Sequence, residues 1–277
     1  MSRIDAHHHL WRYEPAAYPW ISDAMPLLKR DYGVADLDEA VAGTGVTGTV
    51  AVQAQHAVGE TEWLLRLARE HSLIRGVVGW VPLVSPGVAA DLERLAADPG
   101  LKGVRHIVHD EPDDAYVLRD DFNRGVSALE RFGLVYDVLI FARHLPNALA
   151  FVDRHPRQPF VVDHIAKPVI AAGRFDIAWA QGIRALGERP HVTCKLSGIV
   201  TEVRDAEWSV ELIRPYVEVA LEAFGPNRLM FGTDWPVCRL RCEYGAWVDA
   251  VSALLATLSE EEQQATWSGT ATRVYGL

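Results

Sequence analysis

The sequence is poor in cysteine, and this scarcity limits the kinds of protein that it can encode. Only three cysteines, Cys194, Cys238 and Cys242, occur in 277 residues. An odd and small number of cysteines does not suit a disulfide framework, so we expect free thiols and a reducing cytoplasm. Cys238 and Cys242 also lack the close-paired spacing of a zinc knuckle, and we interpret them as ordinary thiols.

The sequence also lacks long apolar runs and an excess of positive charge. No run approaches the ~18 apolar residues that a membrane span needs, and the N-terminus lacks the basic-then-apolar pattern of a signal peptide. The net charge of -10 argues against nucleic acid or an anionic membrane as the main partner. It does not exclude an acidic substrate, because a local site can be basic. We expect a small-molecule partner, and the sequence carries no indication of oligomeric state.

What is present is a repeated alternation of short apolar runs and amphipathic stretches. Near-continuous apolar runs are typical of strands that are buried on both faces of a parallel sheet. Eight such runs occur, at residues 3–7, 47–53, 74–80, 102–107, 134–140, 159–164, 191–197 and 228–234.

The stretches between these runs show the 3.6-residue apolar spacing of helices that cover a sheet. The clearest lie at residues 60–71, 88–97, 122–132, 145–154, 175–187 and 210–224. Eight strand–helix units predict an α/β protein with a single-domain (β/α)8 TIM barrel over residues 1–277, a length close to the ~250 residues typical of this fold. An open doubly wound sheet is the alternative. No linker rich in proline, glycine or serine marks a second domain.

Two stretches interrupt the pattern. Residues 10–33 form a long connection rich in tryptophan and tyrosine, and long connections are often lids or binding loops. Its aromatic side chains would either stack on a ring substrate or only anchor the loop. Residues 43–48 spell a dinucleotide fingerprint, but they precede a strand and open no helix, so we reject a phosphate site there.

The stretch Ile-Asp-Ala-His-His-His-Leu near the start carries the first candidate site. Strand alternation predicts that Asp5, His7 and His9 share one face and that Ala6 and His8 share the other. Two imidazoles on one face can hold a metal ion or a polar substrate atom. A tag remnant and a solvated strand end are the structural alternatives.

Further polar residues close most of the later apolar runs. Active sites of TIM barrels lie at the C-terminal ends of the strands, so these residues are expected to converge there. Many buried polar groups at one end are costly unless they are satisfied, which favours a functional explanation. The residues at these ends are His7, His9, Gln53, Trp80, Arg105, His106, Asp137, His164, Lys195 and Asp234.

The ordered set of motifs resembles the amidohydrolase superfamily, and more closely its amidohydrolase-2 branch, which contains sugar lactonases. The resemblance spans the whole chain. It rests on His-x-His, a histidine ending a later strand, an aspartate ending the last one, and the stretches Ile-Asp-Ala-His-His-His-Leu-Trp, Gly-Val-Arg-His, Val-Asp-His-Ile-Ala-Lys-Pro, Cys-Lys-Leu-Ser-Gly and Phe-Gly-Thr-Asp-Trp-Pro.

The resemblance implies that His7, His9 and Asp234, with or without His164, hold one divalent metal such as zinc. Metal-independent lactonases also occur in this branch, so activity without a metal is an equal alternative. A two-metal site is not expected. The fourth run offers Arg105 and not the bridging lysine or carboxylate of two-metal members.

The resemblance also implies a mechanism for opening a lactone. Asp234 would act as the general base, and His164, the histidine pair or a metal would polarise the carbonyl. The residues expected to bind the sugar are Gln53, Arg105, His106, His144 and Trp235, with Lys195 and Lys167 as weaker candidates.

The leading function is therefore hydrolysis of a sugar aldonolactone. A metal-dependent decarboxylase and a pyrone dicarboxylate lactonase of the same branch are the alternative enzymes. A barrel that binds a ligand without catalysing a reaction is the non-enzymatic alternative. Serine hydrolase chemistry is disfavoured because no Gly-x-Ser-x-Gly elbow is present. We expect residues 10–33, 107–118 and 235–243 to determine which lactone is accepted.

Overall fold

The computed structural model describes residues 2–277, and within them eight parallel strands follow one another in chain order. The strands are β1 (Arg3–His8), β2 (Val46–Val52), β3 (Ile74–Gly79), β4 (Leu101–Ile107), β5 (Val135–Leu139), β6 (Phe160–Val162), β7 (Val192–Leu196) and β8 (Leu229–Phe231). The chain just beyond β8 returns to β1. The backbone N–H of Asp234 donates to His7 at 2.8 Å, and that of His9 donates to Trp235 at 2.7 Å. These bonds close the sheet, so the predicted (β/α)8 barrel is confirmed and the open doubly wound sheet is wrong.

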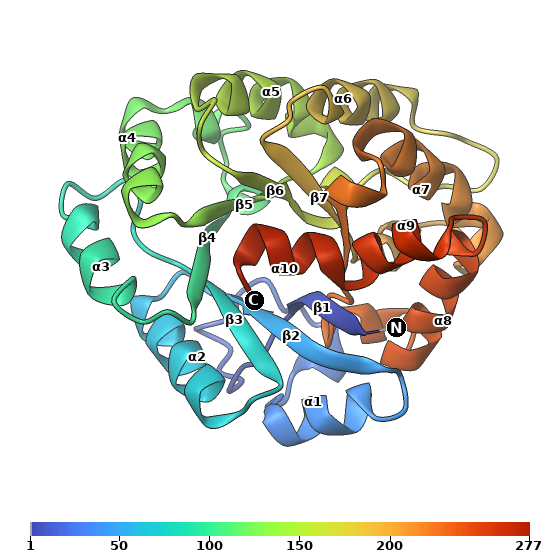
Figure 1. The fold of residues 1–277 in the computed structure, drawn as a ribbon, viewed down its shortest axis with the longest axis horizontal. Coiled ribbons are helices and arrows are strands. Elements are labelled where there is room, and N and C mark those ends of the chain that lie inside the picture. The colour runs from blue at the N-terminus through green and yellow to red at the C-terminus, as the bar shows by residue number, and fades with distance from the viewer. Residues whose placement is uncertain (1) are drawn as a thin grey trace.

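Helices cover the outside of the barrel and one of its ends (Figure 1). They are α1 (Val34–Val41), α2 (Val58–Glu70), α3 (Val88–Leu95), α4 (Asp120–Leu129), α5 (Leu145–Arg154), α6 (Ile177–Gly187), α7 (Val210–Phe224), α8 (Tyr244–Leu255), α9 (Glu260–Gln264) and α10 (Thr270–Tyr275). The six stretches predicted as helical correspond to α2 through α7, with ends that differ by at most three residues. The sequence pattern did not identify α1, α8, α9 or α10. None of the helices within residues 2–277 is long and apolar enough to cross a membrane.

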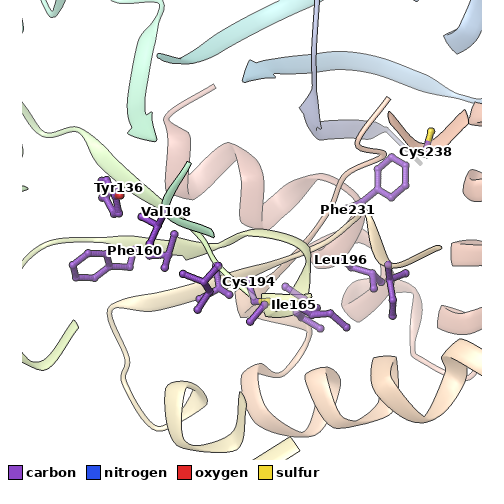
Figure 2. Close-up of a cluster of buried hydrophobic side chains, with 14 of the residues drawn as sticks. Val108, Tyr136, Phe160, Ile165, Cys194, Leu196, Phe231 and Cys238 are labelled. Carbon is purple, nitrogen blue, oxygen red and sulfur yellow. The ribbon is translucent and has the colours of Figure 1, made fainter. Parts of the chain in front are cut away.

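The main core lies between the strands and the helices. Figure 2 shows part of it, from Tyr136 and Phe160 on one side to Phe231 on the other. Cys194 and Leu196 of β7 belong to this cluster. Because strand side chains alternate, the residue between them, Lys195, faces the inside of the barrel.

The inside of the barrel holds a second, smaller apolar cluster. Half of its buried members are valine, and the others include Ile4 and Ala6 of β1 and Tyr275 of α10. Helix α10 lies across one end of the barrel in Figure 1. Lys102, near the start of β4, donates to the carbonyl oxygen of Gly276 at 3.0 Å, so α10 closes the end where the strands begin. The other end, where the strands finish, is left for the site.

Strand β1 does not follow simple alternation. Asp5 pairs with Thr49 and His8 pairs with Ala51, so three steps on β1 face two steps on β2, which is a β-bulge. As a result, His7 enters the barrel together with His9, whereas Asp5 accepts a hydrogen bond from Tyr244 of the surrounding helix α8. The prediction that Asp5 shares a face with His7 was therefore wrong.

Candidate active site

A cavity of about 330 Å³ lies at the C-terminal end of the strands. Four predicted site residues line it: His9, Arg105, His164 and Asp234. His7 is fully buried and contacts all four of these side chains. The structure therefore brings together residues that are more than 200 positions apart in the sequence.

His7, His9 and Asp234 form a compact donor cluster. The Nε2 atoms of the two histidines lie 3.2 Å apart, and Oδ1 of Asp234 lies 3.3 Å from Nε2 of His9 and 3.8 Å from Nε2 of His7. In a tetrahedral zinc site with bonds of about 2.0–2.1 Å, neighbouring ligand atoms are about 3.3 Å apart. The spacing of this cluster is close to that geometry.

The contacts of Nδ1 in His7 and His9 determine whether Nε2 of each ring carries a lone pair. Nδ1 of His9 faces the carbonyl oxygen of Val52 at 2.8 Å, so it must carry the proton and Nε2 is left with a lone pair. Nδ1 of His7 lies 3.3 Å from the carboxylate of Asp163, which favours the same tautomer. Two imine nitrogens and one carboxylate thus converge, and this donor set fits a divalent metal ion.

Arg105 places a fixed positive charge at the edge of this cluster. Its Nη1 lies 3.2 Å from Nε2 of His7 and 3.1 Å from the carboxylate of Asp163. Gln53 holds the other side of the guanidinium through its backbone and side-chain oxygens. Arg105 lines the cavity, so its charge also faces any bound substrate.

His164 and Asp234 lie just beyond the strands that were predicted to contain them. Strand β6 ends at Val162 and β8 at Phe231, so the predicted ends at 164 and 234 were wrong. Both residues have left-handed backbones, with φ of 54° for His164 and 60° for Asp234. Such conformations cost about 1–3 kcal/mol and persist where packing enforces them, often at functional sites. The turns bring Nε2 of His164 to 3.7 Å from Oδ1 of Asp234.

The two side chains have opposite tendencies to ionise. Burial raises the pKa of Asp234, but His164 and His9 outweigh it, so its pKa lies below the ordinary value. Burial lowers the pKa of His164 to about 4 although Asp234 and Asp163 act against it. At neutral pH the site therefore contains an ionised carboxylate beside a neutral imidazole.

Three predicted substrate-binding residues use their polar atoms within the protein. Gln53 bonds Arg105 with both ends of its amide. His106 accepts from Trp80 at 3.2 Å and contacts Glu111 at 2.6 Å. Both ring nitrogens of His144 are also engaged, with the backbone N–H of Phe141 and with Asp114. Their direct contact with substrate stays a prediction.

The other two predicted substrate-binding residues lie away from the cavity wall. Lys195 is fully buried and bonds Asp137 and Asp163. Trp235 packs edge-on against Tyr32, with ring centroids 5.3 Å apart, and borders a separate cavity of about 360 Å³. The sequence predicted substrate contacts for both side chains, whereas the contacts of both in the structure are with other protein groups.

The structure adds lining residues that the sequence analysis did not single out. His109 comes from the connection after β4, and Thr201, Glu202 and Arg204 come from the connection after β7. Lys167, only a weak candidate in the sequence, lies 3.7 Å from Glu202, and Arg204 lies 3.5 Å from the same carboxylate. A Glu-x-Arg pattern soon after a strand end was the available signal.

In the long aromatic connection, residues 10–33, some side chains are buried in the protein and others line the cavity. Trp11 is fully buried, and its Nε1 donates to the backbone carbonyl oxygen of Arg30 at 2.9 Å. Trp20 and Met25 line the cavity, as do Val237 and Leu240 from the connection after β8. The three loops predicted to determine specificity thus all reach the cavity, together with polar residues from the connection after β7.

Comparison with known proteins shows the family of this chain. The sequence matches the family profile described as amidohydrolase over residues 4–277. An L-fucono-1,5-lactonase of Burkholderia multivorans is 44% identical, over 99% of this chain and 96% of the relative. An L-fucono-1,5-lactonase of Burkholderia ambifaria is 40% identical, over 89% and 85%. The crystal structure of an amidohydrolase from Burkholderia multivorans with bound zinc has a TM-score of 0.94 and 42% identity, with both chains fully covered.

Proposed function

We propose that this chain, which belongs to the amidohydrolase family that it matches from residue 4 to residue 277, hydrolyses a sugar 1,5-lactone of the L-fucono type. The observation that carries the proposal is the ionised Asp234 carboxylate, held 3.3 Å from Nε2 of His9 on the wall of a cavity at the C-terminal end of the strands. Opening a lactone requires a base for water and a positive charge for the carbonyl oxygen, and both are present here.

Asp234 is the proposed general base. Its low pKa keeps it ionised at neutral pH, and the left-handed turn directs its carboxylate into the cavity. A water between Asp234 and the lactone carbonyl would lose its proton to the Asp234 carboxylate as the new C–O bond forms. The bond between the carbonyl carbon and the ring oxygen then breaks, the ring oxygen takes the proton back from Asp234 and becomes a hydroxyl group, and the product is the open-chain hydroxy acid.

Arg105 and His164 are the proposed stabilisers of the charge that develops on the carbonyl oxygen. Both line the cavity, Arg105 with a permanent charge and His164 with a neutral imidazole that Ser197 orients at 2.8 Å. We propose zinc as the ion for the cluster of His7, His9 and Asp234, on the basis of its donor set and the zinc-bound relative. When bound there, a divalent ion supplies Lewis-acid polarisation of the carbonyl.

The remaining polar lining favours a neutral polyhydroxylated ring over a dicarboxylate. Lys167 and Arg204 both lie beside Glu202, and a second carboxylate, Asp110, lines the same cavity, so two negative charges face these two cations. A pyrone dicarboxylate would require uncompensated cations to receive two carboxylates. A mixed set of donors and acceptors instead suits sugar hydroxyl groups, which both donate and accept.

The test is a proton-release assay of the purified protein on a panel of aldonolactones. We expect hydrolysis of L-fucono-1,5-lactone, and a loss of about 10²–10⁴-fold in kcat for Asp234→Asn with KM changed far less. Asp110→Asn is the matched control, because Asp110 is also a cavity-lining carboxylate but lies outside the donor cluster. Absence of hydrolysis on the whole panel would overturn the proposal.

The role of the metal is tested on the same protein. Metal content is measured before and after dialysis against a chelator, and kcat is compared at each stage. If zinc polarises the carbonyl, activity falls with zinc content and returns when zinc is added back. Unchanged activity in metal-free protein would assign the polarising role to Arg105 and His164 alone.

A further inference from the structure

A chain of buried charged groups lies inside the barrel, beneath the donor cluster. Lys195, Asp137 and Asp163 are all fully buried. Nζ of Lys195 lies 2.5 Å from Asp137 and 3.0 Å from Asp163. The interior of a TM barrel is usually filled with layers of branched apolar side chains, and buried charges carry a large desolvation cost. This network therefore calls for a role beyond packing.

One end of the network reaches helix α10, which closes the opposite end of the barrel. The hydroxyl group of Tyr275 contacts both carboxylate oxygens of Asp137, at 2.8 and 3.0 Å. The ring of Tyr275 is buried in the interior cluster, and Nζ of Lys195 lies 5.5 Å from its centroid. Tyr275 thus fixes the orientation of Asp137 and borders the space occupied by the Lys195 ammonium group.

The other end of the network reaches the site. Oδ1 of Asp163 lies 3.3 Å from Nδ1 of His7, and Nζ of Lys195 lies 3.2 Å from the same nitrogen. Asp163 also bonds Arg105 at 3.1 Å. Oδ1 of Asp163 is therefore shared between the Lys195 ammonium group and His7, so a displacement of Lys195 changes how Asp163 holds the imidazole.

We propose that Tyr275 is a positioning residue for the reaction, acting from the far end of the barrel through Asp137, Lys195 and Asp163 on His7. The role of His7 in turnover rests on the proposed function. Tyr275 holds Asp137, Asp137 holds the Lys195 ammonium group, and in this position Lys195 shares Oδ1 of Asp163 with Nδ1–H of His7. This arrangement keeps Nε2 of His7 unprotonated and directed at His9 and Asp234. Without the phenol hydroxyl group, Asp137 is free to rotate and Lys195 to shift toward Asp163.

The test is Tyr275→Phe, which keeps the ring and removes only the hydroxyl group. Tyr136→Phe is the matched control. Tyr136 precedes Asp137 on β5 and is fully buried, but its hydroxyl group has no hydrogen-bond partner among residues 2–277. We expect kcat to fall about 10-fold in Tyr275→Phe, with KM changed by less than about 2-fold, and we expect no change in Tyr136→Phe. A loss of this size is typical when a residue that orients a site histidine is removed.

A second readout does not depend on turnover. In protein labelled with ¹⁵N-histidine, the two ring nitrogens of His7 report its tautomer directly, and the signal is assigned by its loss in His7→Gln. We expect a single tautomer protonated at Nδ1 in the wild type and in Tyr136→Phe, and a mixture in Tyr275→Phe. If Tyr275→Phe does not fold, Asp137→Asn breaks the same connection one step nearer and should show the same two effects.

The outcomes separate this inference from the proposed function. An unchanged His7 tautomer in a folded Tyr275→Phe or Asp137→Asn protein overturns the inference, as does an unchanged kcat on a lactone that the wild type hydrolyses. Equal losses of kcat in Tyr275→Phe and Tyr136→Phe also overturn it. If the wild type hydrolyses no lactone, the proposed function fails, and the tautomer measurement alone decides the inference.

Discussion

Asp5 and His7 direct their side chains to opposite faces of β1, although a single residue separates them, and the carboxylate of Asp5 accepts the backbone N–H of His7 at 3.0 Å. The same carboxylate accepts the backbone N–H of Thr233 at 2.9 Å, its hydroxyl group at 2.6 Å and the hydroxyl group of Tyr244 at 2.9 Å. Asp5 therefore ties the strand that carries His7 to the turn that carries Asp234.

Replacing Asp5 should destabilise the protein strongly. Asp5→Ala leaves several buried donors without an acceptor, and we expect the free energy of unfolding to fall by about 3–5 kcal/mol in urea titrations. Tyr244→Phe is the control, because it removes one hydrogen bond of the same carboxylate and should cost about 1 kcal/mol. Equal losses in the two variants would show that the remaining bonds to Asp5 contribute little.

The β-bulge in β1 separates what the sequence could predict, the strands, from what it could not, the face on which each side chain of β1 lies. Near-continuous apolar runs identify buried parallel strands because both of their faces are covered, and all eight strands were predicted. The face on which a side chain lies depends also on the register between neighbouring strands. In β1 that register slips between Asp5 and His8, so the prediction for Asp5 was wrong while that for His7 and His9 was correct.

Glu60 should make stability depend on pH. Its carboxylate is buried at the start of α2, and burial raises its pKa from 4.5 to about 7 although the backbone N–H groups of Gln55 and Ala54 bond to it. A raised pKa in the folded state means that folding favours the protonated form. Its contribution to stability is complete below pH 4.5 and is lost as the pH rises through 7.

The comparison is with Glu60→Gln, which cannot titrate. Between pH 4.5 and 7 we expect the free energy of unfolding of the wild type to fall relative to this variant by up to about 3 kcal/mol, at about 1.4 kcal/mol per pKa unit. Urea titrations at several pH values measure this difference. A difference that stays constant across the range would contradict a raised pKa for Glu60.

The cavity lining was harder to predict than the barrel. His9, Arg105, His164 and Asp234 were predicted correctly as neighbours, because the ends of parallel strands meet at one end of a barrel. Lys195 ends a predicted run in the same way, but its side chain lies deeper, inside the barrel. Height along the barrel axis depends on strand stagger, which one sequence does not reveal.

His109 is a lining residue that loop conformation, and not a strand pattern, brings to the site. Its ring stacks on Phe141 with centroids 4.6 Å apart, and its buried Nδ1 has no hydrogen-bond partner in the described part of the chain, residues 2–277. Burial, with Lys167 and Arg105 nearby, lowers its pKa, so the ring is neutral at pH 7. A neutral imidazole on the cavity wall is suited to a hydrogen bond with a sugar hydroxyl group.

We expect His109→Leu to raise KM by about 5- to 100-fold with kcat changed little, which corresponds to the loss of one hydrogen bond to a neutral substrate. His109→Gln keeps a polar group of similar reach and should recover part of the loss. The measurement is steady-state lactone hydrolysis. A drop in kcat at constant KM would instead place His109 at the reacting carbonyl.

Gly198 should be the glycine to which the site is most sensitive. It has φ of 62° and follows Ser197, and a Cβ atom there would lie 2.5 Å from Nδ1 of His164 and 3.0 Å from Oδ2 of Asp234. Gly198→Ala must therefore displace both side chains. We expect kcat to fall at least 100-fold, since the proposed base and the proposed carbonyl partner move together.

Gly133→Ala is the matched control for this substitution. Gly133 has φ of 64°, and a Cβ atom there meets nothing within 4 Å among the described residues. Both variants carry the strain of alanine in a left-handed conformation, about 1 kcal/mol or more, so both should lose some stability in urea. Only Gly198→Ala should lose activity, because only its methyl group reaches the site. Equal kcat values for the two variants would mean that the positions of His164 and Asp234 are not critical for turnover.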